Sequence, residues 1–191
     1  NKKDAKIFSK AILHNADRLS EMVTSLIDLS RIEYGELKFV IEKIVLNQII
    51  ESVVLAYKNK AKRKNIQVVF ERQSDVTVKS DAKAIERVLN NLLDNAFKYS
   101  PENSIIQINL KKQGEAIRLA VIDQGEGVAA EDQDLVFKRF FRTASARANT
   151  PQGSGLGLAI VKNLVYNLQG DVGVESRPKG GSEFWFTIPI K

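Results

Sequence analysis

Apolar residues recur at helical spacing from residue 4 to residue 34, and no glycine or proline interrupts them. We expect one long helix over this range, ended by Gly35, because a glycine commonly follows the last helical turn. The apolar stripe of this helix consists of Phe8, Ile12, Leu19, Met22, Val23, Leu26 and Leu29. One helix cannot bury such a stripe alone, so we predict that it self-associates or packs on the rest of the chain.

The period of the apolar residues changes after Gly35, and strand patterns then alternate with helix patterns. Period-two patterns predict strands at residues 37–44, from 66 and from 76, a hairpin at 105–112 and 115–123, and a closing hairpin from 171 and 182. Helices are predicted at residues 47–64 with Asn47 as the N-cap, from Ser80 or Asp81 to Pro101, at 129–141 and at 155–170. Residues 143–154 are small and polar and predict a mobile loop. This order favours an α+β fold, a two-layer α/β sandwich with a mixed sheet packed on three longer helices.

The helix that ends before Pro101 has an unusual polar face. Its apolar face consists of Ile85, Val88, Leu89, Leu92, Leu93 and Ala96. Its interior also carries Asn90, Asn91 and Asn95, although asparagine is a mediocre helix former because its amide competes for backbone hydrogen bonds. At about 100° per residue, Asn91, Asn95 and Lys98 fall within roughly 60° of one another. This polar line suits a magnesium-bound phosphate chain, and a solvated outer face explains the helix equally well when it is taken alone.

Composition excludes several classes of chemistry. The 191 residues include no cysteine, which rules out thiol chemistry, and a single histidine, His14, which argues against zinc sites and catalytic triads. The net charge of +6 permits a polyanionic ligand. The basic run Lys58–Lys64 fits either a patch for nucleic acid or an acidic partner, or simply a solvated helix end. No run is long enough to span a membrane and no signal peptide is visible, so we expect a cytoplasmic chain, with anchoring of its parent protein left open.

Two glycine-rich turns follow the asparagine-bearing helix. The first, DQGEG at Asp123–Gly127, leaves the end of an apolar strand, where glycines let a flat ligand approach the backbone. The second, GSGLGL at Gly153–Leu158, opens a helix, where free N–H groups and the helix dipole favour phosphate. Neither has the spacing of a P-loop or of a dinucleotide fingerprint. Each turn alone is also compatible with an ordinary loop.

Taken in order, these segments resemble the catalytic ATP-binding region of bacterial sensor histidine kinases, within the gyrase, Hsp90, histidine kinase and MutL superfamily. The sequence NNLLDNAFKYSP resembles the N box of that family, DQGEG the G1 box, FKRFFR at 137–142 the F box, GSGLGL the G2 box and GGSEF at 180–184 the last glycine motif. The helix before Gly35 is similar to the second helix of the family's dimerisation and phosphoacceptor hairpin. The resemblance covers essentially the whole chain. It implies a hairpin remnant at residues 1–35 and an ATP-binding domain of the Bergerat type at 36–191.

The resemblance implies a site for ATP and Mg²⁺. Asp123 would accept a hydrogen bond from the adenine amino group, and Gly125 and Gly127 would give the base room. Asn95 would ligate Mg²⁺ through its amide oxygen, because magnesium takes few protein oxygens beside phosphates and water. Asn91 would support the metal or a bound water.

The phosphates and the nucleoside would be held by a second group of residues. Lys98, with Arg139 or Arg142, would neutralise the phosphates, and Tyr99 would pack near the nucleoside. Residues 143–154 would form the lid. The second glycine turn is included in the predicted nucleotide site as Gly153, Ser154, Gly155, Leu156, Gly157 and Leu158. The residues predicted to act in catalysis are Asn91, Lys98 and Arg142.

One position bears on the reaction. Hydrolytic members of the superfamily carry a glutamate one helical turn before the metal-binding asparagine, and here that position is Asn91, whose amide cannot act as a general base. We therefore expect slow hydrolysis and transfer of the γ-phosphate to an imidazole. The family's acceptor histidine is followed by an acid and, shortly after, by a proline. His14 is followed by Asn15, and the first proline is Pro101, so we expect the acceptor on a segment missing from this sequence and no autophosphorylation by this fragment.

Two other functions remain open at the level of sequence. One is a non-enzymatic module that senses nucleotide, and the other is a slow ATPase of the same superfamily. The expected partners are ATP and ADP, the phosphoacceptor helix of the parent kinase, a response regulator reached through the parent, and a second copy of the N-terminal helix. Nucleic acid is not expected, because no surface pattern of aromatic and basic residues supports it.

Overall fold

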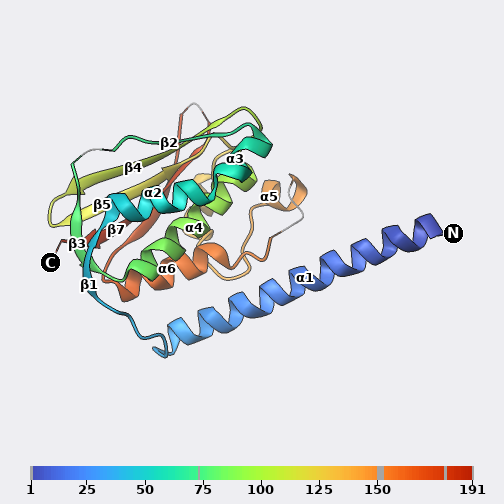
Figure 1. The fold of residues 1–191 in the computed structure, drawn as a ribbon, viewed down its shortest axis with the longest axis horizontal. Coiled ribbons are helices and arrows are strands. Elements are labelled where there is room, and N and C mark those ends of the chain that lie inside the picture. Colours follow the sequence, from blue (N-terminus) through green and yellow to red (C-terminus); the bar gives the residue numbers. More distant parts are fainter. Residues whose placement is uncertain (1, 73, 150–152, 179, 191) are drawn as a thin grey trace. The chain divides into compact units, whose positions relative to one another are not determined.

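The computed structural model describes residues 2–72, 74–149, 153–178 and 180–190 (Figure 1). The chain divides into two compact units, residues 1–37 and residues 38–191. The first unit is helix α1 (Lys2–Glu33), which confirms the single long helix predicted from the apolar stripe. Gly35 adopts a φ of 69° just beyond its end. Within the described ranges, no helix combines the length and apolar character needed to cross a membrane.

The second unit is built on a mixed sheet of five strands. The strands lie in the order β2 (Gln67–Phe70), β4 (Ile105–Gln113), β5 (Ala116–Ile122), β7 (Ser182–Pro189) and β6 (Val172–Ser176). Strands β2 and β4 are parallel, and the other neighbours are antiparallel. Both predicted hairpins, β4–β5 and β6–β7, are therefore confirmed. Two further strands, β1 (Glu42–Val45) and β3 (Thr77–Ser80), pair with each other as a separate antiparallel ribbon.

Three helices cover one face of this sheet, as the two-layer sandwich requires (Figure 1). They are α2 (Leu46–Ala56), α4 (Ala82–Tyr99) and α6 (Gly157–Asn167). The predicted apolar face of α4 is buried along its whole length, and none of its six residues is more than 2% exposed. Leu119 and Phe186 of the sheet are fully buried in the same core. Burial of one face of α4 leaves Asn91 and Asn95 outside the core, on the side of the helix where the candidate site lies.

The region around α2 differs from the sequence prediction. The strand predicted at residues 37–44 begins only at Glu42, and Val45, not Asn47, is the N-cap of α2. Asn47 is fully buried, and its Oδ1 accepts a hydrogen bond of 2.8 Å from the backbone N–H of Val76. The prediction of Asn47 as the cap is wrong because a local pattern cannot reveal an acceptor needed by a backbone far away in the sequence.

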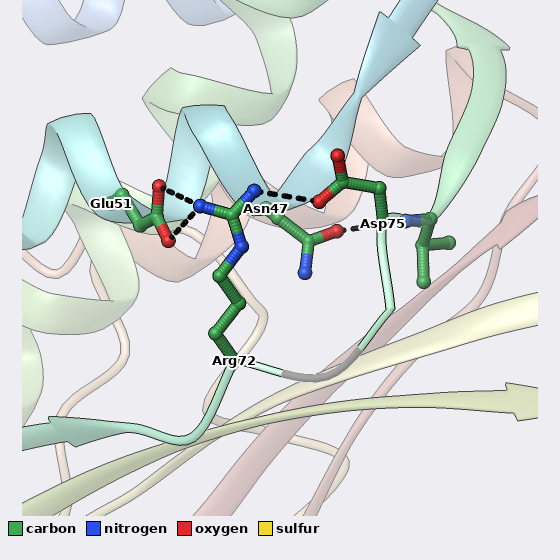
Figure 2. Close-up of polar contacts among 5 residues, drawn as sticks. Asn47, Glu51, Arg72 and Asp75 are labelled. Atoms are coloured by element: carbon green, nitrogen blue, oxygen red, sulfur yellow. Dashed lines mark hydrogen bonds and ion pairs between the residues drawn. The ribbon is translucent and has the colours of Figure 1, made fainter.

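An exposed ion cluster next to Asn47 joins α2 to the segment between β2 and β3 (Figure 2). Arg72 donates to Glu51 of α2 at 2.9 Å and to Asp75 at 2.8 Å. Together with the Asn47 bond to Val76, this arginine fixes the approach of the chain to β3. Because its partners are about half exposed, the cluster positions the segment more than it stabilises the fold.

Two helix predictions also need correction. The basic run Lys58–Lys64 is a separate helix, α3, because Tyr57 interrupts its continuity with α2. Residues 129–141 form a 3₁₀ turn, η1 (Ala130–Asp132), and further turns instead of a helix, since burial of Val136 and Phe137 overrides local propensity.

The predicted loop at 143–154 contains helix α5 (Ala144–Asn149). The hydroxyl of Thr143 accepts a hydrogen bond from the N–H of Ala146 at 3.1 Å, which caps this helix. Residues 150–152 of the predicted lid lie outside the described residues.

Candidate functional site

A cavity of about 260 Å³ lies between α4, the turn after β5, helix α5 and the start of α6. Its described lining belongs entirely to the second unit. The sequence-predicted site residues that line it are Asn91, Asn95, Lys98, Tyr99, Asp123, Gly127, Arg142, Gly153, Ser154, Gly155, Gly157 and Leu158. The polar line of α4 and both glycine turns thus meet in one space, although they lie far apart in the sequence.

The cap of α4 and its buried face together orient the polar line. Asp81 accepts from the N–H of Ala84 through Oδ1 at 2.8 Å and from the N–H of Val40 through Oδ2 at 2.6 Å. This carboxylate therefore both caps the helix and ties it to the preceding chain. With the apolar face held in the core, Asn91, Asn95 and Lys98 are left facing the cavity.

The amide of Asn91 has a defined orientation. Its Nδ2 donates a hydrogen bond of 2.8 Å to the backbone carbonyl of Arg87, one turn earlier in the helix. Its Oδ1 lies 2.9 Å from the position that a Cβ at Gly157 would occupy. The amide oxygen therefore points toward the start of α6, and glycine at 157 leaves room for it.

Asp123 presents a buried carboxylate to the cavity. The residue is 4% exposed, and its Oδ1 accepts backbone hydrogen bonds from Gly125 at 2.8 Å and from Ser182 at 3.1 Å. Among the described residues no hydrogen bond to Oδ2 is present. Burial raises the pKa of Asp123, and the bonds from Gly125 and Ser182 and the charge of Arg177 oppose that rise. The carboxyl is thus held as a directed acceptor for a donor on a ligand.

The glycines of the first turn have different roles. A Cβ at Gly125 would lie 2.8 Å from the backbone oxygen of Tyr99, so the turn and α4 approach each other too closely for a side chain. Gly125 does not appear in the described cavity lining, whereas Gly127, with a φ of 84°, does. The first glycine therefore allows close packing against α4, and the last supplies a positive φ at the wall of the cavity.

The second glycine turn lies against the cation of α4. A Cβ at Gly153 would come within 2.0 Å of Lys98 Nζ, and the φ of 146° at this glycine is itself unfavourable for a side chain. Gly155 accepts from the N–H of Phe140 at 2.9 Å, which links the turn to the F-box segment. Leu156 is fully buried, so its side chain belongs to the core and only its backbone is available to a ligand. Lys98 and the start of α6 form the electropositive end of the cavity.

The two candidate arginines are separated by the structure. Arg142 lines the cavity and donates through Nη2 to the carbonyl of Ala146 in α5. It also lies beside Tyr99, whose hydroxyl pKa is raised by burial and lowered in part by the charge of Arg142. Arg139 is exposed and lies outside the described lining. The geometry therefore favours Arg142 as the cation that serves this site.

Sequence reasoning missed two carboxylates and an amide of the lining, Asp94, Glu126 and Asn149. Asp94 could have been found by the helical projection that found its neighbours, because it lies three residues after Asn91 and four before Lys98. Glu126 stands within the first glycine turn and accepts a hydrogen bond of 2.6 Å from Asn149 Nδ2. No sequence signal links these two residues, since one belongs to a turn and the other to an unpredicted helix.

The donor set determines what the cavity can hold. In the part of the chain that the structure describes, there is no group of three or more His, Cys, Asp or Glu side chains that could hold a metal ion by itself. A divalent cation here would therefore take few protein ligands and would depend on the oxygens of a bound phosphate chain and on water. Asn95 would supply one neutral oxygen ligand for such an ion, and Lys98 and Arg142 would supply positive charge for the phosphates. The residues thus fit magnesium bound together with a nucleotide.

Comparisons with known proteins agree with this chemistry. The profile of a family described as histidine kinase-, DNA gyrase B-, and HSP90-like ATPase matches residues 80–191. The chain is 38% identical over 182 residues to the sensor-like histidine kinase SenX3 of Mycobacterium tuberculosis, covering 95% of this chain and 44% of SenX3.

Two solved structures are similar over nearly the whole chain. Full-length ShkA in complex with AMPPNP gives a TM-score of 0.82 at 25% identity, over 96% of this chain and 38% of that one. Histidine kinase ThkA in complex with the response regulator protein TrrA gives a TM-score of 0.77 at 27% identity, over 94% of this chain and 49% of that one. The chain therefore spans less than half the length of each of these proteins.

Proposed function

Because the chain belongs to the family of histidine kinase-, DNA gyrase B- and HSP90-like ATPases, we propose that it is the ATP-binding catalytic part of a sensor histidine kinase. It binds ATP with Mg²⁺ in the cavity between α4 and α6 and donates the γ-phosphate to a histidine. One observation carries this proposal. The buried carboxylate of Asp123 lines the same cavity as the amide of Asn95 and the cation of Lys98.

Asp123 is the residue that recognises adenine. A carboxylate oxygen accepts a hydrogen bond from the exocyclic amino group of adenine, whereas guanine presents a carbonyl oxygen at that position and would be repelled. The two backbone bonds to Oδ1 support this role, because they hold the carboxylate in place before a ligand arrives. Discrimination of this kind is strong where the acceptor is buried.

Asn95 and the cations act at the phosphate end. The amide oxygen of Asn95 would ligate Mg²⁺, and Asn91 would support the ion or a bound water. Lys98 and Arg142 neutralise the phosphates, and the backbone N–H groups of Gly155–Gly157 hold them at the start of α6. The metal, when bound, would neutralise the charge that develops during transfer.

Transfer to an imidazole fits the site better than attack by water. The amide of Asn91 is bonded to Arg87 and cannot remove a proton. Asp94 pairs with Lys60, and Glu126 accepts from Asn149, so the other described carboxylates at the rim are already engaged. An imidazole nitrogen needs no such base, because its lone pair forms the N–P bond as the bond between the γ-phosphorus and its bridging oxygen breaks.

The acceptor histidine and the downstream partner are parts of this proposal. His14 is the single histidine of the sequence, and its side chain lies outside what the structure describes. We infer that the acceptor is carried by a phosphoacceptor helix of the parent kinase and that the phosphoryl group then passes to a response regulator. The similarity to ThkA, whose structure was solved with the response regulator protein TrrA, supports that second step.

Helix α1 serves association in this scheme. Phe8, Ile12 and Leu19 of its apolar stripe are 67%, 69% and 63% exposed, which is costly for side chains of this size unless a partner covers them. We propose that this stripe pairs with helices of a second copy, in the manner of a helical bundle.

Two experiments test the function: calorimetry of ATP binding, and transfer of labelled phosphate from ATP to a histidine. Wild-type chain should bind ATP with Mg²⁺, and Asp123→Ala and Asn95→Ala should weaken that binding, whereas Asn90→Ala on the same helix should not, because Asn90 is not among the described lining residues. Adding a phosphoacceptor helix in trans with γ-labelled ATP should then label its histidine. Unchanged affinity in the first two variants would refute the site, and binding without transfer would indicate a nucleotide sensor instead.

A further inference from the structure

An ion pair connects the basic helix α3 to the nucleotide cavity. Lys60 Nζ lies 2.6 Å from Oδ1 of Asp94, and Asp94 lines the cavity. On α4, Asp94 lies one turn from both Asn91 and Lys98, so its carboxylate stands beside the polar line that faces the ligand. The basic run, which the proposed function leaves without a role, thus supplies a counter-ion to a carboxylate of the site.

The position of Lys60 is maintained by aromatic packing. Its ammonium lies 5.2 Å from the ring centroid of Tyr57 and 5.3 Å from that of Phe97. These two rings stack with centroids 5.4 Å apart, and the hydroxyl of Tyr57 donates to the carbonyl of Asn90 at 3.1 Å. Lys64 adds a bond of 2.6 Å to the carbonyl of Phe97. A cation held over two rings loses less entropy on pairing than a free surface lysine does.

An unpaired carboxylate at Asp94 would work against the ligand. ATP brings several negative charges to the phosphate end of the cavity, and a bare carboxylate beside Asn95 would repel them. Pairing with Lys60 removes the net charge while leaving Asp94 in place. We propose that Lys60 is a positioning residue that neutralises Asp94 and thereby raises affinity for the phosphates of the nucleotide; this inference rests on the proposed function.

The pair is partly exposed, with side-chain exposures of 37% for Lys60 and 58% for Asp94, so its effect must depend on salt. An effect on phosphates must also be absent for a ligand without them. These two properties distinguish neutralisation from a structural contribution of Lys60 to the packing of α3 on α4.

The test is a double-mutant cycle measured by calorimetry with ATP and with adenosine. Lys60→Met keeps an unbranched side chain next to the two rings and removes the charge. Asp94→Asn removes the opposite charge, and Lys62→Met is the matched control, because Lys62 is an exposed lysine of the same helix. Each variant is measured at about 50 mM and about 500 mM salt, on either side of effective screening.

We expect Lys60→Met to weaken ATP binding about threefold at low salt, as for a partly exposed ion pair, with a smaller loss at high salt and unchanged adenosine binding. Asp94→Asn should strengthen ATP binding, and the double variant should bind as Asp94→Asn does.

Three outcomes would overturn the inference. Lys60→Met would weaken ATP binding no more than Lys62→Met does, Lys60→Met would weaken adenosine binding as much as ATP binding, or the double variant would bind ATP as weakly as Lys60→Met does. Weaker ATP binding by Asp94→Asn would also overturn it, because Asp94 would then assist the metal. In each of those cases wild-type binding of ATP would leave the proposed function standing, whereas wild-type chain that binds no ATP would refute both.

Discussion

Asn149 Nδ2 donates a hydrogen bond of 2.6 Å to Glu126 Oε1, and this bond joins helix α5 to the turn that follows strand β5. Both residues line the nucleotide cavity, and both side chains are exposed. The bond therefore joins two segments of the cavity wall. Since α5 is only six residues long, it depends on such contacts more than on its own helical hydrogen bonds.

Loss of this bond should loosen α5. In Asn149→Ala, we expect faster amide hydrogen exchange in residues 144–149 and unchanged exchange in α6. ATP dissociation should accelerate about twofold to threefold, because one exposed hydrogen bond contributes at the low end of the usual range. Exchange measured by mass spectrometry and stopped-flow release of a fluorescent nucleotide would check both. Glu126→Gln retains an acceptor oxygen and should behave like wild type; equal loosening in both variants would contradict the role of this bond.

Asp123→Asn should separate stability from binding. Burial raises the folded-state pKa of Asp123, so the stability linked to its protonated form is fully present below the unfolded pKa and is lost as the pH rises through the folded pKa. The asparagine bears no such charge and can still accept both backbone bonds. We expect a higher unfolding temperature than wild type at pH 7, and a difference that vanishes below the usual carboxyl range of about 4. Thermal melts across this pH window would measure it.

The same variant should bind ATP at least about tenfold more weakly, because its Nδ2 would face the adenine amino group, donor against donor. Asp134→Asn, which alters an exposed carboxylate, is the control and should change neither property. A destabilised Asp123→Asn at neutral pH would show that the buried charge is better compensated than its surroundings indicate.

Two glycine substitutions should affect different properties, the stability of the fold in one variant and the affinity for ATP in the other. Gly125→Ala forces a Cβ to 2.8 Å from the backbone oxygen of Tyr99, which cannot move away without disturbing α4, so we expect a loss of about 1–3 kcal/mol in the free energy of unfolding. Gly157→Ala meets only the end of the Asn91 side chain, at 2.9 Å, and alanine suits a helix better than glycine. We therefore expect wild-type stability but weaker ATP binding. Denaturant unfolding and calorimetry, run on both variants, would test the contrast, which equal stabilities would disprove.

Removal of Asn95 should eliminate most of the magnesium dependence of ATP binding. If its amide oxygen ligates Mg²⁺, then Asn95→Ala should lose most of the gain in ATP affinity that the metal gives to wild type, on the order of tenfold. Affinity in the presence of a chelator should be similar in the two proteins. Titrations with and without Mg²⁺ measure the difference, and Asn90→Ala should keep the full dependence. A normal magnesium response in Asn95→Ala would assign the metal to the phosphates alone.

Charge on the apolar stripe of α1 should prevent association. Leu19→Glu places a carboxylate among side chains that we expect a second copy to cover, and the sedimentation coefficient should shift toward the monomer. Thr24→Glu adds the same charge at another exposed position of the helix, on the side opposite the predicted stripe, and should leave association unchanged. A wild-type chain that sediments as a monomer at every concentration would refute the proposal for α1.

Local patterns were sufficient where a residue's role is set by its own helix or strand. The apolar stripes predicted α1 and α4, and the alternation around Gly114 predicted the β4–β5 hairpin. The order of the motifs was enough to predict the sandwich and the family. Local patterns gave wrong predictions at two places. The side-chain oxygen of Asn47 accepts from the distant N–H of Val76, and at residues 129–141 burial took precedence over helical propensity.

The sequence by itself determined which residue types stand on each face of α4, because a fixed rotation per residue relates position to direction. Only the tertiary structure decided that Asp123 shares a cavity with Asn95, that Arg142 lines this cavity while Arg139 remains outside, and that Lys60 reaches Asp94. The physical reason is that these relationships join segments distant in the chain. Their distances are set by packing of the helices on the sheet, which no local period encodes.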